Sequence, residues 1–151
     1  MSLSDLLSPE QVIAELQSEE HWPSIAELVD HLVETSTLTT EQKEPALAAL
    51  KEREEHGSTG IGGGIAIPHA KLAHIDEIVA VFGRSTPGVD FCAHDCAPVH
   101  YLFLFLVPEG QHGAHLKTLA SIAKTLKSAE IRTRLSSADD AEEIYQILSE
   151  G

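Results

Sequence analysis

The chain is poor in cysteine and basic residues, and it contains no long apolar segment. Its 2 cysteines, Cys92 and Cys96, provide no disulfide framework, so we expect a reducing compartment, the cytoplasm. No apolar run approaches the length that is needed to cross a bilayer. The first residues, MSLSDLLSPEQ, lack the basic segment followed by an apolar one that marks a signal peptide.

The shortage of basic residues excludes two classes of function. The 10 lysines and arginines are outnumbered by 24 aspartates and glutamates, which gives a formal net charge of -14. A surface this acidic repels phosphate backbones and anionic lipids, so we expect no nucleic-acid partner and no membrane insertion. The acidity itself is interpreted as an aid to solubility, and steering of a basic partner is the alternative.

Three familiar motifs of nucleotide binding and catalysis are missing as well. The glycine-rich segment 57–64 has no Gly-Lys-Ser/Thr, which a Walker loop requires. A dinucleotide fingerprint that starts at Gly60 would need Gly or Ala where Ile65 stands. No G-x-S-x-G elbow of a serine hydrolase occurs. The glycine-rich segment is therefore a candidate for holding a single phosphoryl group and not a nucleotide.

The pattern that is present is an alternation of helices and strands. A chain of 151 residues suits one domain with its own core, so we treat residues 1–151 as a single domain. Strands interleaved with helices favour an α/β (α+β) layered fold. We predict helices at 8–16, 24–35, 41–55, 113–127, 129–135 and 139–149, and strands at 65–67, 78–84 and 99–107. The last strand is nearly all apolar, which is typical of a central strand covered on both faces.

Two prolines bear on where the first and third of these helices begin. Ser8-Pro9-Glu10-Gln11 resembles a capping box with proline at the first helical position, which predicts a short helix through about Leu16. Pro45 conflicts with a helix over 41–55. Either this helix begins near Glu44, or Pro45 lies in a strained first turn.

The most informative stretch is the glycine-rich loop with the Pro-His pair that follows it. Glycine allows positive φ, and consecutive free N–H groups in such a turn form an anion-binding nest. A purely structural turn is the alternative interpretation of the loop. Residues 65–67 are predicted to be a buried strand that ends at Pro68 and His69. Proline would rigidify the approach to His69, whose neutral imidazole is nucleophilic near neutral pH.

The sequence of this stretch also carries a family resemblance. Residues 57–71 read GSTGIGGGIAIPHAK, which resembles the signature of type-2 EIIA components of the bacterial phosphoenolpyruvate-dependent phosphotransferase system. This class contains the mannitol/fructose and nitrogen-regulatory IIA proteins. The segment ALKEREEHGSTG carries Arg53 where the family has an arginine, and HLKTLASIAKTL carries His115 where it has a second active-site histidine. The segments IRTRL and EEIYQIL resemble the family's C-terminal helices, so the resemblance covers about residues 24–149.

The resemblance implies a fold and a chemistry. The fold would be a mixed parallel and antiparallel sheet flanked by helices. His69 would accept a phosphoryl group from HPr or a nitrogen-branch HPr homologue, and no cofactor or metal would be required. Arg53 would pair with the phosphoryl oxygens, and His115 would donate a hydrogen bond to them or orient His69. The implied phosphoryl-binding loop consists of Ser58, Thr59, Gly60, Gly62, Gly63 and Gly64.

The family contains regulatory and transport proteins, and both readings stay open. A stand-alone nitrogen-regulatory protein would act on regulatory target proteins, whereas a transport subunit would donate to a separate IIB protein. The chain shows no attached IIB or membrane IIC domain, and GSTGIGGGIAIPH is closer to the nitrogen-regulatory form, so regulation is favoured. Gly63 replaces a frequent Asn, and Ala70 a frequent Gly, which bears on loop rigidity and partner choice. A non-catalytic regulatory binding module is the alternative of another class.

Each site residue also has a structural alternative. Arg53 would then belong to a solvated helix end, His115 would cap or pack a helix, and the loop hydroxyls would cap local structure. A zinc-binding protein is a further alternative, although C-x3-C is an unusual spacing for zinc. Its candidate ligands are Cys92, His94, Cys96 and His100, or the pair His112 and His115. The other histidines are interpreted as surface or loop residues: His21, His31, His56, His74 and His112.

Overall fold

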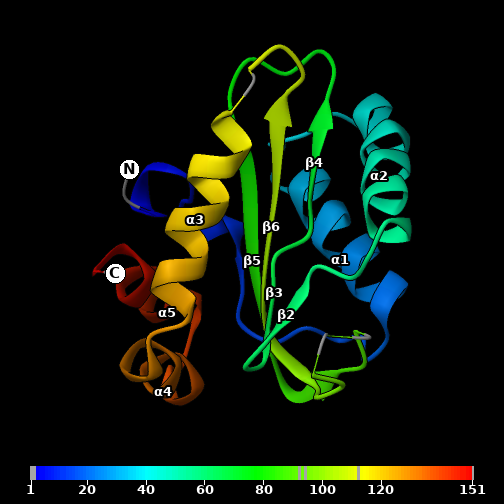
Figure 1. Cartoon of the computed structure of the whole chain (residues 1–151). Helices are drawn as coiled ribbons and strands as arrows, with labels where there is room; N and C mark the ends of the chain where they lie inside the picture. The colour runs from blue at the N-terminus through cyan, green and yellow to red at the C-terminus, as the bar shows by residue number, and fades with distance from the viewer. Residues whose placement is uncertain (1–2, 92, 94, 112, 151) are drawn as a thin grey trace.

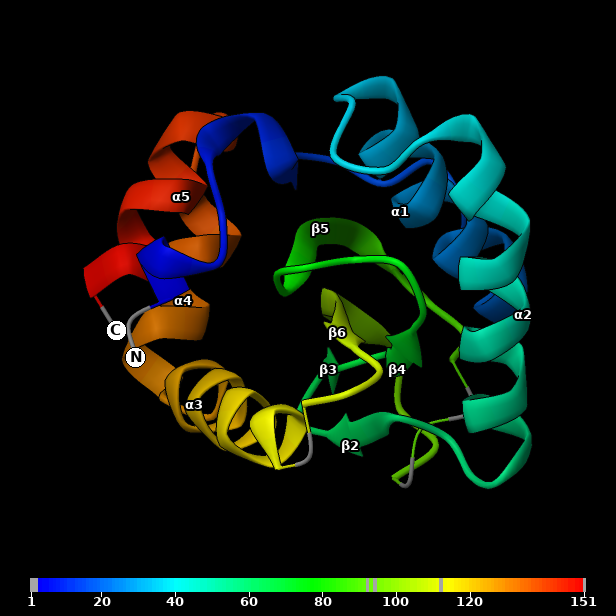
Figure 2. The same ribbon diagram turned by 90° about the horizontal axis from the view of Figure 1, so that it is seen from above.

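A mixed sheet separates two groups of helices. The computed structural model describes residues 3–91, 93, 95–111 and 113–150. Two helices cover one face of the sheet and three cover the other, which Figure 1 shows from the side and Figure 2 from above. The first group is α1 (His21–Glu34) and α2 (Thr40–Glu55); the second is α3 (Ala114–Leu126), α4 (Ala129–Ser137) and α5 (Ala141–Glu150). The predicted α/β layered fold is confirmed.

The sheet has 6 strands arranged around a central one. In chain order they are β1 (Val12–Ile13), β2 (Gly60–Gly62), β3 (Ile65–Ala66), β4 (His69–Leu72), β5 (Val79–Val89) and β6 (Val99–Pro108). The order across the sheet is β1-β5-β6-β3-β2, with β4 also pairing with β6. β5 runs antiparallel to β6, whereas β3 and β4 run parallel to it. The expectation of a mixed sheet is therefore confirmed.

The central strand β6 explains where the core lies. Side chains alternate between the two faces of a strand, and both faces of β6 are covered. Phe103 and Phe105 pack with the cluster under α3 to α5, whereas Leu102 and Leu104 pack with the cluster under α1 and α2. All four side chains are fully buried. The apolar run at 99–107 is thus a central strand, as predicted.

The short helix predicted from Ser8 to about Leu16 is wrong beyond Gln11. Residues Pro9–Gln11 form a single 3-10 turn, after which β1 pairs with β5. Gln11 accepts a hydrogen bond from the Ser8 N–H at 3.0 Å and donates one to the Ala80 carbonyl at 2.7 Å. The chain is thereby fixed to the edge of β5, where the β-branched residues of β1 extend the sheet.

The observed position of Pro45 in the helix contradicts both predicted alternatives for the start of α2. The helix begins at Thr40, earlier than Glu44, so Pro45 lies in its second turn. Thr39 caps the helix: its hydroxyl accepts from the Gln42 N–H at 3.2 Å, and its own N–H donates to the Gln42 side chain at 2.9 Å. This cap, together with the buried face at Ala46 and Leu50, stabilises the helix despite the missing proline N–H.

The remaining helices were predicted correctly to within a few residues. Helices α1, α3, α4 and α5 correspond to the predicted segments 24–35, 113–127, 129–135 and 139–149. Within the described part of the chain, every helix is too short or too polar to cross a bilayer.

Candidate functional site

The candidate site is built around the first residue of β4. β3 and β4 pair with β6 in one continuous register, since Ala66 lies opposite Leu102 and His69 opposite Phe105. Ile67 and Pro68 lie between the two strands; Pro68 has no N–H to donate, but its carbonyl accepts from the Phe105 N–H at 3.0 Å. The strand predicted at 65–67 does end before Pro68, as β3, but a separate strand, β4, begins at His69 and was not predicted. His69 is thus the first residue of a strand that is paired with the central strand β6.

The imidazole of His69 is held in a defined orientation. Its Nδ1 lies 2.8 Å from the carbonyl oxygen of Ile67. Because a carbonyl oxygen can only accept, Nδ1 carries the proton and the lone pair of the neutral ring lies on Nε2. The ring also stacks on Phe105, with centroids 5.2 Å apart and planes 9° from parallel. Both contacts fix the orientation of the ring, in which Nε2 carries the lone pair.

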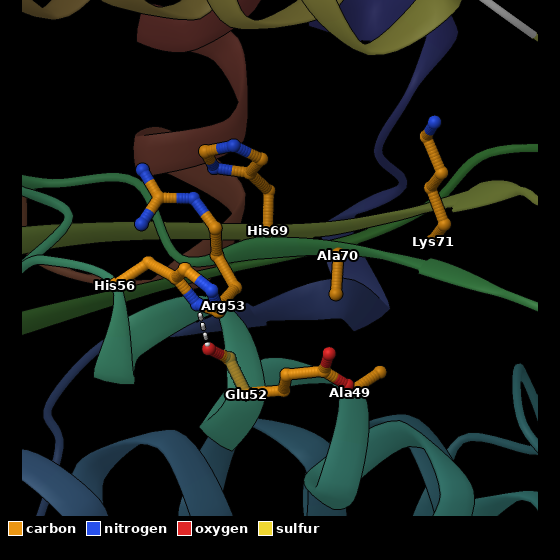
Figure 3. A pocket seen from close by; sticks show the side chains of 7 residues that line it. All are labelled: Ala49, Glu52, Arg53, His56, His69, Ala70 and Lys71. Atoms are coloured by element: carbon orange, nitrogen blue, oxygen red, sulfur yellow. Dashed lines mark hydrogen bonds between the residues drawn. The ribbon is translucent and has the colours of Figure 1, made fainter.

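Arg53 lies beside His69 in one cavity of about 360 Å³. It comes from the last turn of α2, and its Nη1 donates to the Gly57 carbonyl at 2.9 Å. In Figure 3 the guanidinium and the His69 ring project to the same side of β4, with Lys71 farther along the strand. Arginine has five N–H donors, and the described contacts of Arg53 use one of them. The arrangement suits an anion with several acceptor oxygens.

His115 is the second residue of α3, so its backbone lies at the start of that helix as predicted. Its side chain lies outside what the structure describes. The chain reaches α3 from the end of β6, where Pro108 lies opposite Leu72 of β4. The role of His115 stays a prediction.

The described lining of the cavity includes none of the residues of the glycine-rich loop. Gly62, Gly63 and Gly64 have φ of 93°, 68° and 80°, values that favour glycine. Gly62 ends β2, and Gly63 and Gly64 form the turn to β3. The backbone N–H of Gly63 donates to the Asp95 carboxylate at 3.2 Å. The Gly60 N–H donates to the Ser58 hydroxyl at 3.0 Å. These N–H groups have partners within the protein, so direct phosphoryl binding by the loop stays a prediction.

The structure adds residues that were not predicted as part of the site. His56 was interpreted as a surface residue, and it is exposed, but it also lines the cavity. Its spacing of three residues from Arg53 was a signal for this, since such positions share one side of a helix. Glu54 is also new: its side chain is only 1% exposed, although carboxylates are rarely buried. Its sequence neighbourhood gave no signal, because Glu52 and Glu55 lie at the same helix end and are exposed.

The zinc alternatives mostly concern residues outside the described part of the chain. Cys92, His94 and His112 are not described, so these sites are untested. His100 lies in β6, and its Nδ1 donates to the Ser85 carbonyl at 2.9 Å. Among the residues that the structure describes, no three His, Cys, Asp or Glu side chains are grouped to hold a metal ion.

Comparison with known proteins identifies the family. A sequence profile described as "Phosphoenolpyruvate-dependent sugar phosphotransferase system, EIIA 2" matches residues 5–151. The chain belongs to this EIIA type-2 family. The EIIA chain is 36% identical over 149 residues to a nitrogen regulatory protein of Bradyrhizobium diazoefficiens, covering 99% of this chain and 95% of that one.

Two further relatives bear on the branch of the family. A crystal structure of the nitrogen regulatory protein IIA-Ntr from Neisseria meningitidis matches this EIIA chain with a TM-score of 0.85 and 31% identity, covering 97% of this chain and 98% of that one. A fructose-specific EIIA component of Haloferax volcanii is 36% identical over 110 residues, covering 73% of this chain and 71% of that one. The EIIA chain is thus similar to proteins of both branches.

Proposed function

We propose that this EIIA protein is a phosphocarrier that accepts a phosphoryl group on Nε2 of His69. The observation that carries the proposal is the bond between His69 Nδ1 and the Ile67 carbonyl at 2.8 Å, which leaves the lone pair on Nε2. Arg53 lines the same cavity and supplies positive charge for the phosphoryl oxygens. A neutral imidazole held in one tautomer is a suitable covalent acceptor.

The proposed step is in-line transfer between two histidines. The Nε2 lone pair of His69 forms a bond to phosphorus while the phosphorus–nitrogen bond of the donor phosphohistidine breaks. The donor imidazole keeps the electron pair of that bond, and the proton on His69 Nδ1 stays in its bond to Ile67. Catalysis then depends on positioning and on charge stabilisation by Arg53, with His115 as a second group that donates a hydrogen bond to the phosphoryl oxygens. The donor is HPr or a nitrogen-branch HPr homologue.

We further propose that the protein is regulatory. Its identity of 36% to a nitrogen regulatory protein extends over 99% of the chain, which supports this branch. A phosphoryl group adds close to two negative charges beside Arg53, and this change would alter which target proteins dock. The cytoplasmic location expected from the sequence stays a prediction.

A sugar-transport role is the second candidate. It is supported by the fructose-specific EIIA component with 36% identity over 110 residues. In that case the phosphoryl group would pass from His69 to a separate IIB protein. Two rates distinguish the two roles: the rate of transfer of the phosphoryl group from this protein to a fructose-type IIB domain, and the rate of its return to HPr. Rapid transfer to IIB would replace the regulatory proposal with the transport one.

Phosphoryl transfer in a purified mixture tests the carrier proposal. The mixture contains phosphoenolpyruvate, the first enzyme of the system, either HPr or its nitrogen-branch homologue, and this protein. We expect an acid-labile, base-stable mass gain of one phosphoryl group in the wild type and none in His69→Ala. His74→Asn is the matched control, because His74 is exposed and asparagine tolerates its φ of 66°. If neither donor labels the wild type, a non-catalytic binding module becomes the better account.

A further inference from the structure

A buried carboxylate lies one residue after Arg53, and the proposed reaction does not use it. The Glu54 side chain accepts hydrogen bonds from the Thr59 N–H, at 3.0 and 3.3 Å to its two oxygens. It also accepts from the Thr59 hydroxyl. Burial and a helix C-terminus both disfavour a carboxylate, and the hydrogen bonds from Thr59 offset part of this cost.

The Glu54 carboxylate also faces a histidine of α1 that is packed between aromatic rings. Its second oxygen lies 3.5 Å from Nε2 of His21, which has no hydrogen-bond partner among the described residues. The His21 ring stacks on Trp22, with centroids 5.0 Å apart, and contacts Phe91, with centroids 4.1 Å apart. The interpretation of His21 as a surface or loop residue is corrected here, since its side chain is only 18% exposed. Aromatic rings therefore hold the imidazole of α1 that faces Glu54.

A continuous set of hydrogen bonds connects Glu54 to the candidate acceptor. Glu54 holds Thr59, and the Thr59 carbonyl accepts from the Ile67 N–H at 3.0 Å. The Ile67 carbonyl in turn accepts from His69 Nδ1 at 2.8 Å. Arg53, the neighbour of Glu54 in the last turn of α2, binds the Gly57 carbonyl of the same loop. The last turn of α2 thus holds the loop at two points.

We propose that Glu54 is a positioning residue that acts through Thr59 and Ile67 to keep the His69 ring in its Nδ1–H tautomer. The inference deepens the proposed function, because the orientation of His69 affects phosphoryl transfer only if His69 is the acceptor. Misplacing a reacting atom by about 1 Å lowers a rate by about a hundredfold. Loss of the Glu54 bonds is therefore expected to slow acceptance without weakening docking of the donor protein, which does not contact this buried side chain.

The test combines phosphoryl-transfer kinetics with ¹⁵N NMR of the unphosphorylated histidine rings. In Glu54→Ala we expect the rate constant of acceptance to fall by about ten- to a hundredfold, with KM for the donor unchanged. We also expect the His69 signals to show a mixture of tautomers. Glu55→Ala is the matched control, because Glu55 is an exposed glutamate in the same helical turn. It is expected to leave both readouts at wild-type values.

A second pair of variants keeps the inference testable if Glu54→Ala does not fold. Thr59→Val removes the hydroxyl that donates to Glu54 and keeps the backbone N–H, so an intermediate effect is expected; Thr59→Ser keeps both donors and should restore wild-type behaviour. Unchanged rates and tautomer signals in Glu54→Ala, or in Thr59→Val if that variant alone folds, would overturn the inference. If the wild type is not phosphorylated, the proposed function fails, but the tautomer signals still decide the role of Glu54.

Discussion

Replacing Arg53 by glutamine should slow phosphoryl acceptance strongly. Arg53→Gln removes the positive charge beside His69 and leaves a shorter, uncharged polar side chain. A hydrogen bond to a charged group contributes about 1.5–3 kcal/mol, and about 1.4 kcal/mol corresponds to a tenfold change in rate. The half-buried position of Arg53 allows solvent screening, so the lower part of this range applies. We expect acceptance to slow by about ten- to thirtyfold.

Two further variants separate charge from geometry. Arg53→Lys keeps the charge but loses the planar fork, so its rate should lie between those of the wild type and Arg53→Gln. Lys51→Gln is the matched control, because Lys51 is an exposed cation of the same helix. The assay is single-turnover transfer from phosphorylated HPr or its homologue, with the thermal midpoint as a check on folding. A rate for Arg53→Gln within twofold of Lys51→Gln would refute the electrostatic role of Arg53.

Three predictions concern stability. Pro45→Ala should raise the free energy of unfolding in urea by about 1–3 kcal/mol, because proline in the second turn of α2 lacks a helical N–H; a decrease would show that the ring makes a needed contact. Leu50→Ala should lower that free energy by about 2–5 kcal/mol, because Leu50 is fully buried; a loss below about 1 kcal/mol would contradict its place in the core. The Asp30 carboxylate, 2.6 Å from the Lys43 ammonium, raises the pKa of Lys43 above its ordinary value of 10.5. Since Lys43 has the higher pKa in the folded state, this stabilisation is present below pH 10.5 and is lost above the raised pKa. The urea midpoints of the wild type and Lys43→Gln should therefore differ at neutral pH and converge in strong alkali.

The elements that the sequence predicted are those with a strong local pattern. Helix α1 follows the spacing of Ile25, Leu28, Val29 and Leu32, all of which are buried, and β6 follows a long apolar run. The two-residue strand β1 has no such pattern. It exists because Val12 lies opposite Phe82, far away in the chain, and because Gln11 binds the Ala80 carbonyl. Periodicity in the sequence does not report such long-range pairing.

The candidate site likewise combines residues that local sequence patterns predict with residues that only the folded chain brings together. The sequence and its family resemblance predicted Arg53 and His69, and the structure brings both to one cavity. The strand β4 was missed because its pairing with β6 joins residues that are distant in the sequence. Glu54 was missed because its burial against His21 and the loop arises only in the folded chain. The glycine-rich loop was recognised from its composition, but the partners of its N–H groups, such as Asp95, could not be inferred from composition.

The most direct test of the central claim is to locate the phosphoryl group by ¹⁵N and ³¹P NMR of the phosphorylated protein. The structure fixes Nδ1 of His69 in a bond to the Ile67 carbonyl, so phosphorus should be coupled to Nε2 of His69 and to no other ring nitrogen. The Nδ1 proton should remain visible in its hydrogen bond. Phosphorus on Nδ1 of His69, or on another histidine such as His56, would contradict the account.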